Sequence, residues 1–295
     1  MAYICDLATI DVYYRVLGLP DPGAKAWALI DFAQVKHLRH QLKRFWFYGI
    51  YLKTQDYGPL SYGRTQYDYQ AGSLVFVAPG QVAGIDDGKV TENPEGLALL
   101  FHPELSYTKQ LKSLLKNYSF FAYSSNEALH LAPDELTPIV RLMHQCSAAH
   151  THEAAIALLK QLLERFRRYY LRQFSSRHQL NCDALARFES LMMDYFHSDK
   201  PTSLGLPTVA WCAEQLHFSP NYLGDMIKKE TGRSALAYIH HFIVDYIKQR
   251  LSDPNPTISS IAWEMGFAQP HHLSRLFKKE TGLSPKAYRA QLRHL

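Results

Sequence analysis

The chain has 295 residues, of which 47% are hydrophobic and 20% are charged, and its net charge is +5. This length allows two domains with separate cores, and the hydrophobic fraction excludes a disordered chain. The charge is unevenly distributed, because residues 201–295 hold 11 Lys and Arg against 7 Asp and Glu, a surplus of 4 that indicates an anionic partner for the last third.

The N-terminal residues and the cysteines indicate a cytoplasmic protein. Asp6 and Asp11 interrupt the first stretch, and no basic segment precedes an apolar one, so the N-terminus does not resemble a secretory signal. No apolar run approaches the roughly 20 residues of a membrane-spanning helix, so we expect no membrane association. Four scattered cysteines indicate neither a disulfide framework nor a zinc knuckle: Cys5, Cys146, Cys182 and Cys212.

The first 130 residues favour short strands. They are rich in β-branched and aromatic runs separated by glycine and proline. The predicted strands are 44–53, 62–69, 72–82 and 96–103. Because no long helical pattern lies among them, we expect a small barrel or sandwich.

From Asp134 onward the apolar residues have helical spacing. We predict a helix around 136–143, a long helix over 156–174 and another over 183–197. The apolar stripe of the long helix is either core or a dimer interface. Five arginines near its end are expected to form a charged, solvent-facing surface, the alternative being a contact between domains or with the DNA backbone: Arg165, Arg167, Arg168, Arg172 and Arg177. The segment 198–207 is predicted to be a loop because it contains two prolines and a glycine.

An internal duplication occupies the last third of the chain. PNYLGDMIKKETGRSALAYI at 220–239 matches PHHLSRLFKKETGLSPKAYR at 270–289, and the match extends upstream to Thr208 and Thr257. Each copy predicts a helix, a turn and a second helix. Gly266 in the second turn suits a left-handed backbone, whereas His217 in the first would adopt it at a cost.

The second helix of each copy has recognisable start and stop signals. Ser219 is a good N-cap before Pro220, and Gln269 is a poorer one before Pro270. Gly232 and Gly282 are predicted to end these helices. A single helix over 234–252, about 27 Å long, would then hold the two second helices about one turn of DNA apart, roughly 34 Å.

The two second helices have opposite apolar and polar faces. The inward positions are Leu223, Met226 and Ile227 in the first copy, and Leu273, Leu276 and Phe277 in the second. The outward positions are Asn221, Gly224, Asp225 and Lys228, and His271, Ser274, Arg275 and Lys278. A purely structural pair of helical hairpins would show the same inward stripes. The duplication, the basic surplus and the polar outward faces together favour binding in the major groove of double-stranded DNA.

At these residues the sequence resembles the AraC/XylS family of bacterial transcription regulators. The motif is carried by Gly266-Phe267, the stretch 273–279, Thr281-Gly282, Ser284-Pro285 and Tyr288-Arg289. The resemblance is strong over 184–295. GSLVFVAPGQV at 72–82 and the FHP that follows also resemble the cupin-like, effector-binding half of the family. The family resemblance implies a homodimer.

The resemblance also implies which residues read bases. In the first copy these are Asn221, Gly224 and Asp225, and in the second they are Pro270, His271, Ser274 and Arg275. Gly224 and Asp225 depart from the longer polar or basic residues of the family. Asp225 would repel phosphates, although a carboxylate can accept a hydrogen bond from cytosine. Lys228, Lys229, Lys278 and Lys279 are either phosphate contacts or ordinary solvated helix ends.

The N-terminal half shows no motif for catalysis or metal binding. His37 and His40 could share a helix face, His150 and His152 lie beside a helical segment, and His102 stands alone. We therefore expect no catalytic residue, no metal and no cofactor. Most aromatic residues in this half should be core. A minority could line a barrel mouth and stack on a sugar or another small polar ligand, the candidates being Trp46, Tyr48, Tyr51, Tyr67 and Tyr69.

Together these patterns predict an α+β protein with two domains. Residues 1–180 would form a cupin-like β-barrel followed by helices, which binds an effector and dimerises. Residues 181–295 would form an all-α DNA-binding domain with two helix-turn-helix copies joined by a long helix. The expected function is sequence-specific transcription regulation. The alternatives are a cupin-type metal enzyme, or a dimerisation module without a ligand, fused to a DNA-binding domain.

Overall fold

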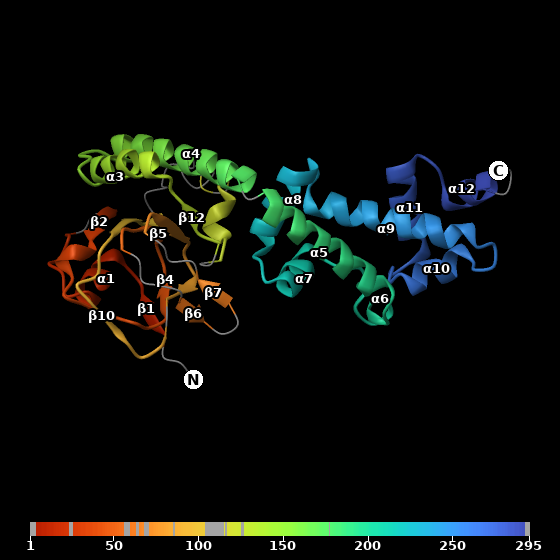
Figure 1. The fold of residues 1–295 in the computed structure, drawn as a ribbon, viewed down its shortest axis with the longest axis horizontal. Coiled ribbons are helices and arrows are strands. Elements are labelled where there is room, and N and C mark those ends of the chain that lie inside the picture. The colour runs from red at the N-terminus through yellow and green to blue at the C-terminus, as the bar shows by residue number, and fades with distance from the viewer. Residues whose placement is uncertain are drawn as a thin grey trace. The chain divides into compact units, whose positions relative to one another are not determined.

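The chain folds into two compact units, residues 1–176 and residues 177–295, coloured red to green and green to blue in Figure 1. The structure is a computed structural model. It describes residues 4–23, 26–55, 60–62, 65–67, 71–84, 86–103, 115, 117–124, 127–176 and 178–292. We call the two parts the N-terminal unit and the C-terminal unit and consider each by itself.

A five-stranded antiparallel sheet is the centre of the N-terminal unit. Its order is β12 (Leu129–His130), β8 (Ser73–Val77), β5 (Tyr48–Lys53), β11 (Leu97–Phe101) and β2 (Trp27–Asp31). All five residues of β11 are buried, because both faces of the sheet are covered. The predicted strands 72–82 and 96–103 correspond to β8 and β11, and 44–53 divides into β5 and a preceding short strand, β4.

Three smaller sheets complete the strands of this unit. β1 (Cys5–Leu7), β4 (Lys43–Phe45) and β9 (Val82–Ala83) form one, β3 (His37–Arg39) and β10 (Val90–Glu92) another, and β6 (Leu60–Tyr62) and β7 (Thr65–Tyr67) the third. In the part of the chain that is described, the strands thus make four sheets and do not close into one barrel. A short helix, α1 (Ile10–Val16), buries Tyr13 and Tyr14 in this unit. The sequence pattern had not predicted this helix, which is only two turns long.

Two helices, α3 (Pro133–Ser147) and α4 (His152–Ser176), cover one face of the five-stranded sheet (Figure 1). The apolar stripe of α4 faces this sheet: the Phe166 ring lies 5.2 Å from that of Phe76 on β8, and the Tyr170 ring stacks on Phe120 at 5.5 Å. Leu162, Leu163 and Phe166 are fully buried. Of the two interpretations offered for this stripe, the structure supports core packing within the unit.

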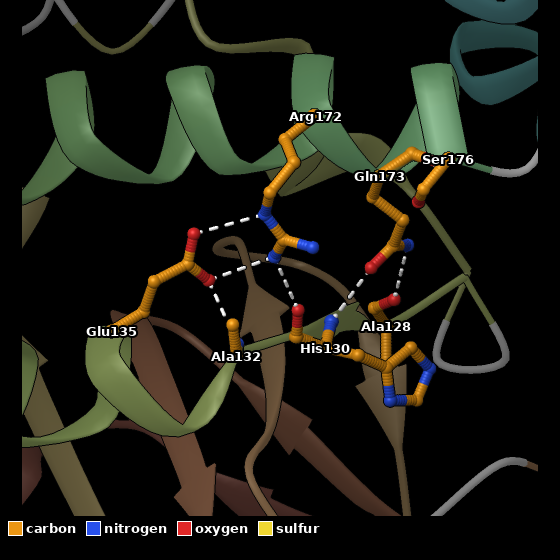
Figure 2. Close-up of polar contacts among 7 residues, drawn as sticks. All are labelled: Ala128, His130, Ala132, Glu135, Arg172, Gln173 and Ser176. Carbon is orange, nitrogen blue, oxygen red and sulfur yellow. Dashed lines mark hydrogen bonds and ion pairs between the residues drawn. The ribbon is translucent and has the colours of Figure 1, made fainter.

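Arg172 on α4 is exposed, as expected, but it also forms an ion pair within the unit. Its guanidinium donates to both carboxylate oxygens of Glu135, at 2.9 and 2.7 Å, and to the carbonyl oxygen of His130 at 2.8 Å (Figure 2). Glu135 also accepts from the backbone N–H of Ala132 at the start of α3. Arg172 therefore connects α4 to the start of α3 and to the β12 backbone.

The neighbouring residue Gln173 completes the hydrogen bonding of β12. Its side-chain oxygen accepts from the His130 N–H at 2.8 Å, and its amide donates to the Ala128 carbonyl at 3.0 Å (Figure 2). β12 lies at the edge of the sheet and has only two residues. The side chain of Gln173 thus satisfies backbone groups that a further strand would otherwise pair.

We expect Arg172→Met to destabilise the N-terminal unit by about 1–2 kcal/mol, because Glu135 would lose its charged partner while only 11% of its side chain is exposed. Arg168→Met is the matched control, since Arg168 is exposed on the same helix. Hydrogen exchange of peptides from α3 and α4 would measure the change. Equal effects of the two substitutions would contradict this role for Arg172.

The C-terminal unit is helical throughout its described residues. It consists of α5 (His178–Phe196), α6 (Lys200–Leu204), α7 (Val209–Leu216), α8 (Pro220–Thr231), α9 (Ala235–Ser252), α10 (Ile258–Glu264), α11 (Pro270–Thr281) and α12 (Pro285–Leu292). The segment predicted to be a loop contains α6, whose buried Pro201 stands at a helix start, where its missing N–H costs nothing. The protein as a whole is thus a mixed α+β structure. Within the described residues, no helix is long and apolar enough to cross a membrane.

Candidate nucleic-acid interface

The duplication in sequence is also a duplication in structure. In the turn between α7 and α8 the Phe218 N–H donates to the Ala213 carbonyl, and between α10 and α11 the Phe267 N–H donates to the Ala262 carbonyl, each at 2.9 Å. The first helix of each copy has a threonine N-cap: Thr208 accepts from the backbone N–H of Trp211, and Thr257 from that of Ser260. The two predicted helix-turn-helix copies are therefore confirmed, with the same turn in each.

The residues at the two turns have the predicted left-handed backbone. His217 has a φ of 61° and Gly266 a φ of 79°. Gly266 also has a second constraint, because a Cβ placed there would lie 2.3 Å from the carbonyl oxygen of Pro201 and 2.8 Å from that of Gly205. The segment containing α6 thus approaches the second turn closely. Periodicity and turn signals could not reveal this contact, because its partners lie some 60 residues earlier in the chain.

The ends of α8 and α11 agree with their predicted signals. The hydroxyl of Ser219 accepts from the Tyr222 N–H at 3.2 Å, while Gln269 makes no capping bond with its side chain. Gly232 and Gly282 end the helices with φ values of 72° and 80°. These positions fix the length of each second helix and hence which residues it presents outward.

The inward faces of α8 and α11 form the core of the unit. Leu223, Met226, Ile227, Leu273 and Phe277 are fully buried, while Leu276 is only half-buried. The connecting helix α9 buries its own apolar side against them. Cys212 on α7 is also core: its Sγ lies 3.9 Å from the Sδ of Met192, and burial raises the pKa of its thiol to about 12.

The residues predicted to bind DNA lie on the opposite sides of α8 and α11. Exposed residues are Asn221 and Lys228 on α8, and His271, Arg275 and Lys278 on α11; half-buried residues are Gly224, Asp225, Pro270 and Ser274. The Ser274 hydroxyl donates to the Pro270 carbonyl at 3.3 Å within its own helix. No other atom lies within 4 Å of a Cβ built on Gly224, so packing does not require glycine there.

Three of the exposed positive charges on these helices form no salt bridge in the described part of the chain. Among the described residues, no salt bridge involves Arg275, Lys228 or Lys278. Each helix also has two lysines in its last turn, where the negative end of the helix dipole stabilises positive charge. The exposed face of α11 therefore offers hydrogen-bond donors and positive charge without a salt-bridge partner, which suits a polyanion, whereas the exposed face of α8 also carries Asp225.

The candidate aromatic residues of the N-terminal unit do not form one site. Tyr51 lines a cavity, whereas Tyr48 lies on the helix-covered face of the sheet and stacks on Phe101 at 5.1 Å. Trp46 is 47% exposed and donates to Asp6. The side chain of Tyr67 on β7, and Tyr69 entirely, lie outside the described residues.

The candidate histidines do not form a metal site in the described part of the chain. His37 lies on strand β3 and pairs with Glu92 at 2.6 Å, and His40, just after this strand, pairs with Asp87 at 2.7 Å. The expectation that they share a helix face is therefore wrong, because their β-strand context separates them. The described residues contain no group of three or more His, Cys, Asp or Glu placed to hold a metal ion.

Comparison with known proteins finds a family match within the C-terminal unit. Residues 212–291 match a helix-turn-helix domain family. YobQ, an uncharacterized HTH-type transcriptional regulator of Bacillus subtilis, is 33% identical over 85 residues, which make up 29% of this chain and 35% of YobQ. This chain thus spans about a third of the length of that relative.

Two further proteins are similar over slightly more than a third of the chain. The multiple antibiotic resistance protein MarA of Salmonella typhimurium is 31% identical over 103 residues, or 35% of this chain and 79% of MarA. The solved C-terminal domain of AraT, a response regulator from Geobacillus stearothermophilus, is 29% identical, with a TM-score of 0.32, and the match covers 37% of this chain and 84% of that domain. From the helix-turn-helix family match, and from 31% identity over most of MarA, we conclude that the chain belongs to the AraC/XylS family of transcription regulators.

Proposed function

We propose that the whole protein is a sequence-specific transcription regulator that binds double-stranded DNA through both helix-turn-helix copies. In this proposal α8 and α11 enter successive major grooves on one side of the duplex. Arg275 and His271 read bases from the second copy, together with Ser274 and Pro270, and Asn221 reads bases from the first. Lys228 and Lys278 contact phosphates.

The observation that carries the proposal is the pair of identical turns that present two exposed, polar helices. A purely structural duplication would need only the inward residues of α8 and α11. Such a duplication would not explain why Arg275 and Lys278 lie on the outward side of α11 without a salt-bridge partner among the described residues. The connecting helix α9 has 18 residues, about 27 Å at 1.5 Å per residue, which suits two helices spaced by roughly one DNA turn.

The first copy has a weaker chemical basis for reading bases. Gly224 contributes no side chain, and Asp225 offers only a hydrogen-bond acceptor for a cytosine amino group. We therefore propose that the second copy supplies most of the sequence preference, while the first copy contributes Asn221 and the phosphate contacts of its lysines.

For the N-terminal unit we propose a cupin-like effector-binding and dimerisation domain in a cytoplasmic homodimer. The resemblance at 72–82 supports the cupin-like assignment, and the cavity lined by Tyr51 supports effector binding. The exposed Leu171 on the outer side of α4 supports a subunit contact there. Effector binding would change the arrangement of the subunits, and hence which half-sites the DNA-binding units can reach.

Selection of duplexes from a random library by the full chain tests the regulator proposal. We expect the selected site to bind at least about 10³-fold more tightly than a scrambled site at the same salt concentration. Insertion of about 5 base pairs between the two half-sites would turn one of them to the opposite side of the duplex and should abolish this preference. Equal affinity for selected and scrambled duplexes would overturn the proposal.

A further inference from the structure

The short helix α6 contacts both helix-turn-helix copies of the C-terminal unit. On one side, the Nζ of Lys200 lies 5.5 Å from the ring centroid of Trp211 on α7, the first helix of the first copy. On the other side, α6 packs against α10, the first helix of the second copy (Figure 1). The two copies are therefore joined twice, covalently through α9 and by contact through α6.

The contact between α6 and the second copy is made by backbone atoms. A Cβ built on Gly266 would lie 2.3 Å from the Pro201 carbonyl oxygen, and one built on Gly205 would lie 3.6 Å from the Gly266 carbonyl oxygen. His217, at the equivalent turn position of the first copy, also has a left-handed backbone, but this residue is exposed. The same turn therefore accepts a side chain where it faces solvent and requires glycine where α6 lies against it.

Tyr195 on α5 holds α6 in this position. Its hydroxyl donates to the Gly205 carbonyl oxygen at 2.8 Å, and the Gly205 N–H donates to the Pro201 carbonyl oxygen at 3.0 Å. Both carbonyl groups that approach Gly266 thus accept a hydrogen bond. Tyr195 is only 1% exposed, and its ring packs edge-on against Trp211 with the ring centroids 4.7 Å apart. Tyr195 therefore connects α7 of the first copy to the part of α6 that contacts the second copy.

The second attachment has a consequence for how the two copies can bind DNA. Two copies joined only by α9, a single helix of 18 residues, could bend or rotate about its ends, and the contact through α6 opposes such motion. Each base pair added between two half-sites rotates one of them by about 34° and moves it by about 3.4 Å. A rigid pair of helices α8 and α11 therefore fits one half-site spacing, whereas a pair that can move fits several.

We propose that Tyr195, acting through α6, is a positioning residue that fixes α11 relative to α8 and so sets the half-site spacing that the protein accepts. This inference rests on the DNA-binding function proposed above and adds to it a determinant of specificity outside the two helices that read bases. Tyr195 is fully buried, so its side chain acts on the DNA only through the geometry of the two copies.

Tyr195→Phe tests the proposal, because it removes the hydroxyl that holds α6 and keeps the ring that packs against Trp211. Tyr238→Phe is the matched control. The Tyr238 hydroxyl donates to Glu189, so this substitution breaks a hydrogen bond between α9 and α5 and leaves that to α6 intact. Both variants lose one phenol hydrogen bond inside the C-terminal unit, so a general loss of stability would affect both alike.

The first measurement is the affinity of the full chain for its selected DNA site and for the same site with one base pair inserted between the half-sites. We expect the insertion to weaken binding of the unsubstituted protein and of Tyr238→Phe by about 10-fold or more. For Tyr195→Phe this loss should be smaller by about 3-fold or more, because the contact that must give way is already weakened. An equal loss for all three proteins would overturn the proposal.

The second measurement uses no DNA. Genetically encoded spin labels at Lys229 and Lys279, which are exposed in the last turns of α8 and α11, give the distribution of distances between the two helices by pulsed electron spin resonance. We expect Tyr195→Phe to broaden this distribution and Tyr238→Phe to leave it as it is in the otherwise unsubstituted protein. Distributions of the same width in both variants would contradict the proposal.

The two measurements separate this proposal from the regulator proposal. A broader distribution in Tyr195→Phe, together with equal affinity of the full chain for selected and scrambled duplexes, would contradict only the regulator proposal. Specific DNA binding, together with the same spacing dependence and the same distance distribution in both variants, would contradict only the positioning role of Tyr195.

Discussion

Gly266→Ala is expected to destabilise the C-terminal unit by more than about 3 kcal/mol. An alanine with a φ near 79° costs about 1–2 kcal/mol on its own. The new Cβ would also lie 2.3 Å from the Pro201 carbonyl oxygen and 2.8 Å from that of Gly205, and neither is the flexible end of a side chain. The backbone around α6 or the turn before α11 must therefore move, which disturbs the packing of the second copy.

Gly282→Ala is a matched control for this prediction. Its φ is 80°, and no atom lies within 4 Å of a Cβ built there, so it should lose only the 1–2 kcal/mol of the backbone conformation. Hydrogen exchange of peptides from α10 and α11 would report the C-terminal unit separately from the N-terminal one. If both variants lose the same stability, the close approach of α6 contributes nothing and the prediction fails.

Arg275→Ala is expected to weaken binding at one base pair of the selected DNA site by about 1–3 kcal/mol, or roughly 5- to 150-fold. A loss of binding free energy of this size is expected if the Arg275 guanidinium donates two hydrogen bonds to a guanine. The guanidinium is exposed and forms no salt bridge among the described residues. Affinities of both proteins for sites substituted at each position would measure it. A DNA site in which that guanine is already replaced should bind Arg275→Ala almost as tightly as it binds the unsubstituted protein.

Lys278→Ala provides the contrasting control on the same helix. If Lys278 contacts a phosphate, its substitution should weaken binding to all DNA sequences alike. It should also reduce the slope of log affinity against log salt concentration by about one. If Arg275→Ala instead weakens every site equally, Arg275 contacts a phosphate and the second copy reads bases through His271 and Ser274.

The helical copies were predictable because their signals are local. Thr208, Thr257 and Ser219 cap helices within three residues of themselves, and Gly232 and Gly282 end them. Such signals act on the adjacent backbone, so they can be recognised without knowing what the helix contacts. The inward stripes of α8 and α11 follow from helical spacing alone, with Leu276 deviating because it lies at the edge of its stripe.

The N-terminal unit was less predictable because its residues depend on distant partners. Arg172 is one of the exposed arginines, as expected, but its pairing with Glu135, 37 residues earlier, could not be predicted. Tyr48 and Tyr51 looked equivalent as aromatic candidates. In the sheet, β5 pairs with β8 and β11, and helices cover only one face of it. This arrangement shows that Tyr51 reaches a cavity and Tyr48 does not.

By itself, the sequence determined that a duplicated helix-turn-helix module occupies the last third, with two polar faces turned outward, because helix periodicity and capping are encoded over a few residues. The tertiary structure alone decided why Gly266 must be glycine beyond its turn, and that Lys43, Lys53 and Tyr51 meet in one cavity. Those features arise from contacts between residues far apart in the chain. The free energy of these contacts depends on burial and on how closely distant segments approach each other, which a local sequence pattern cannot reveal.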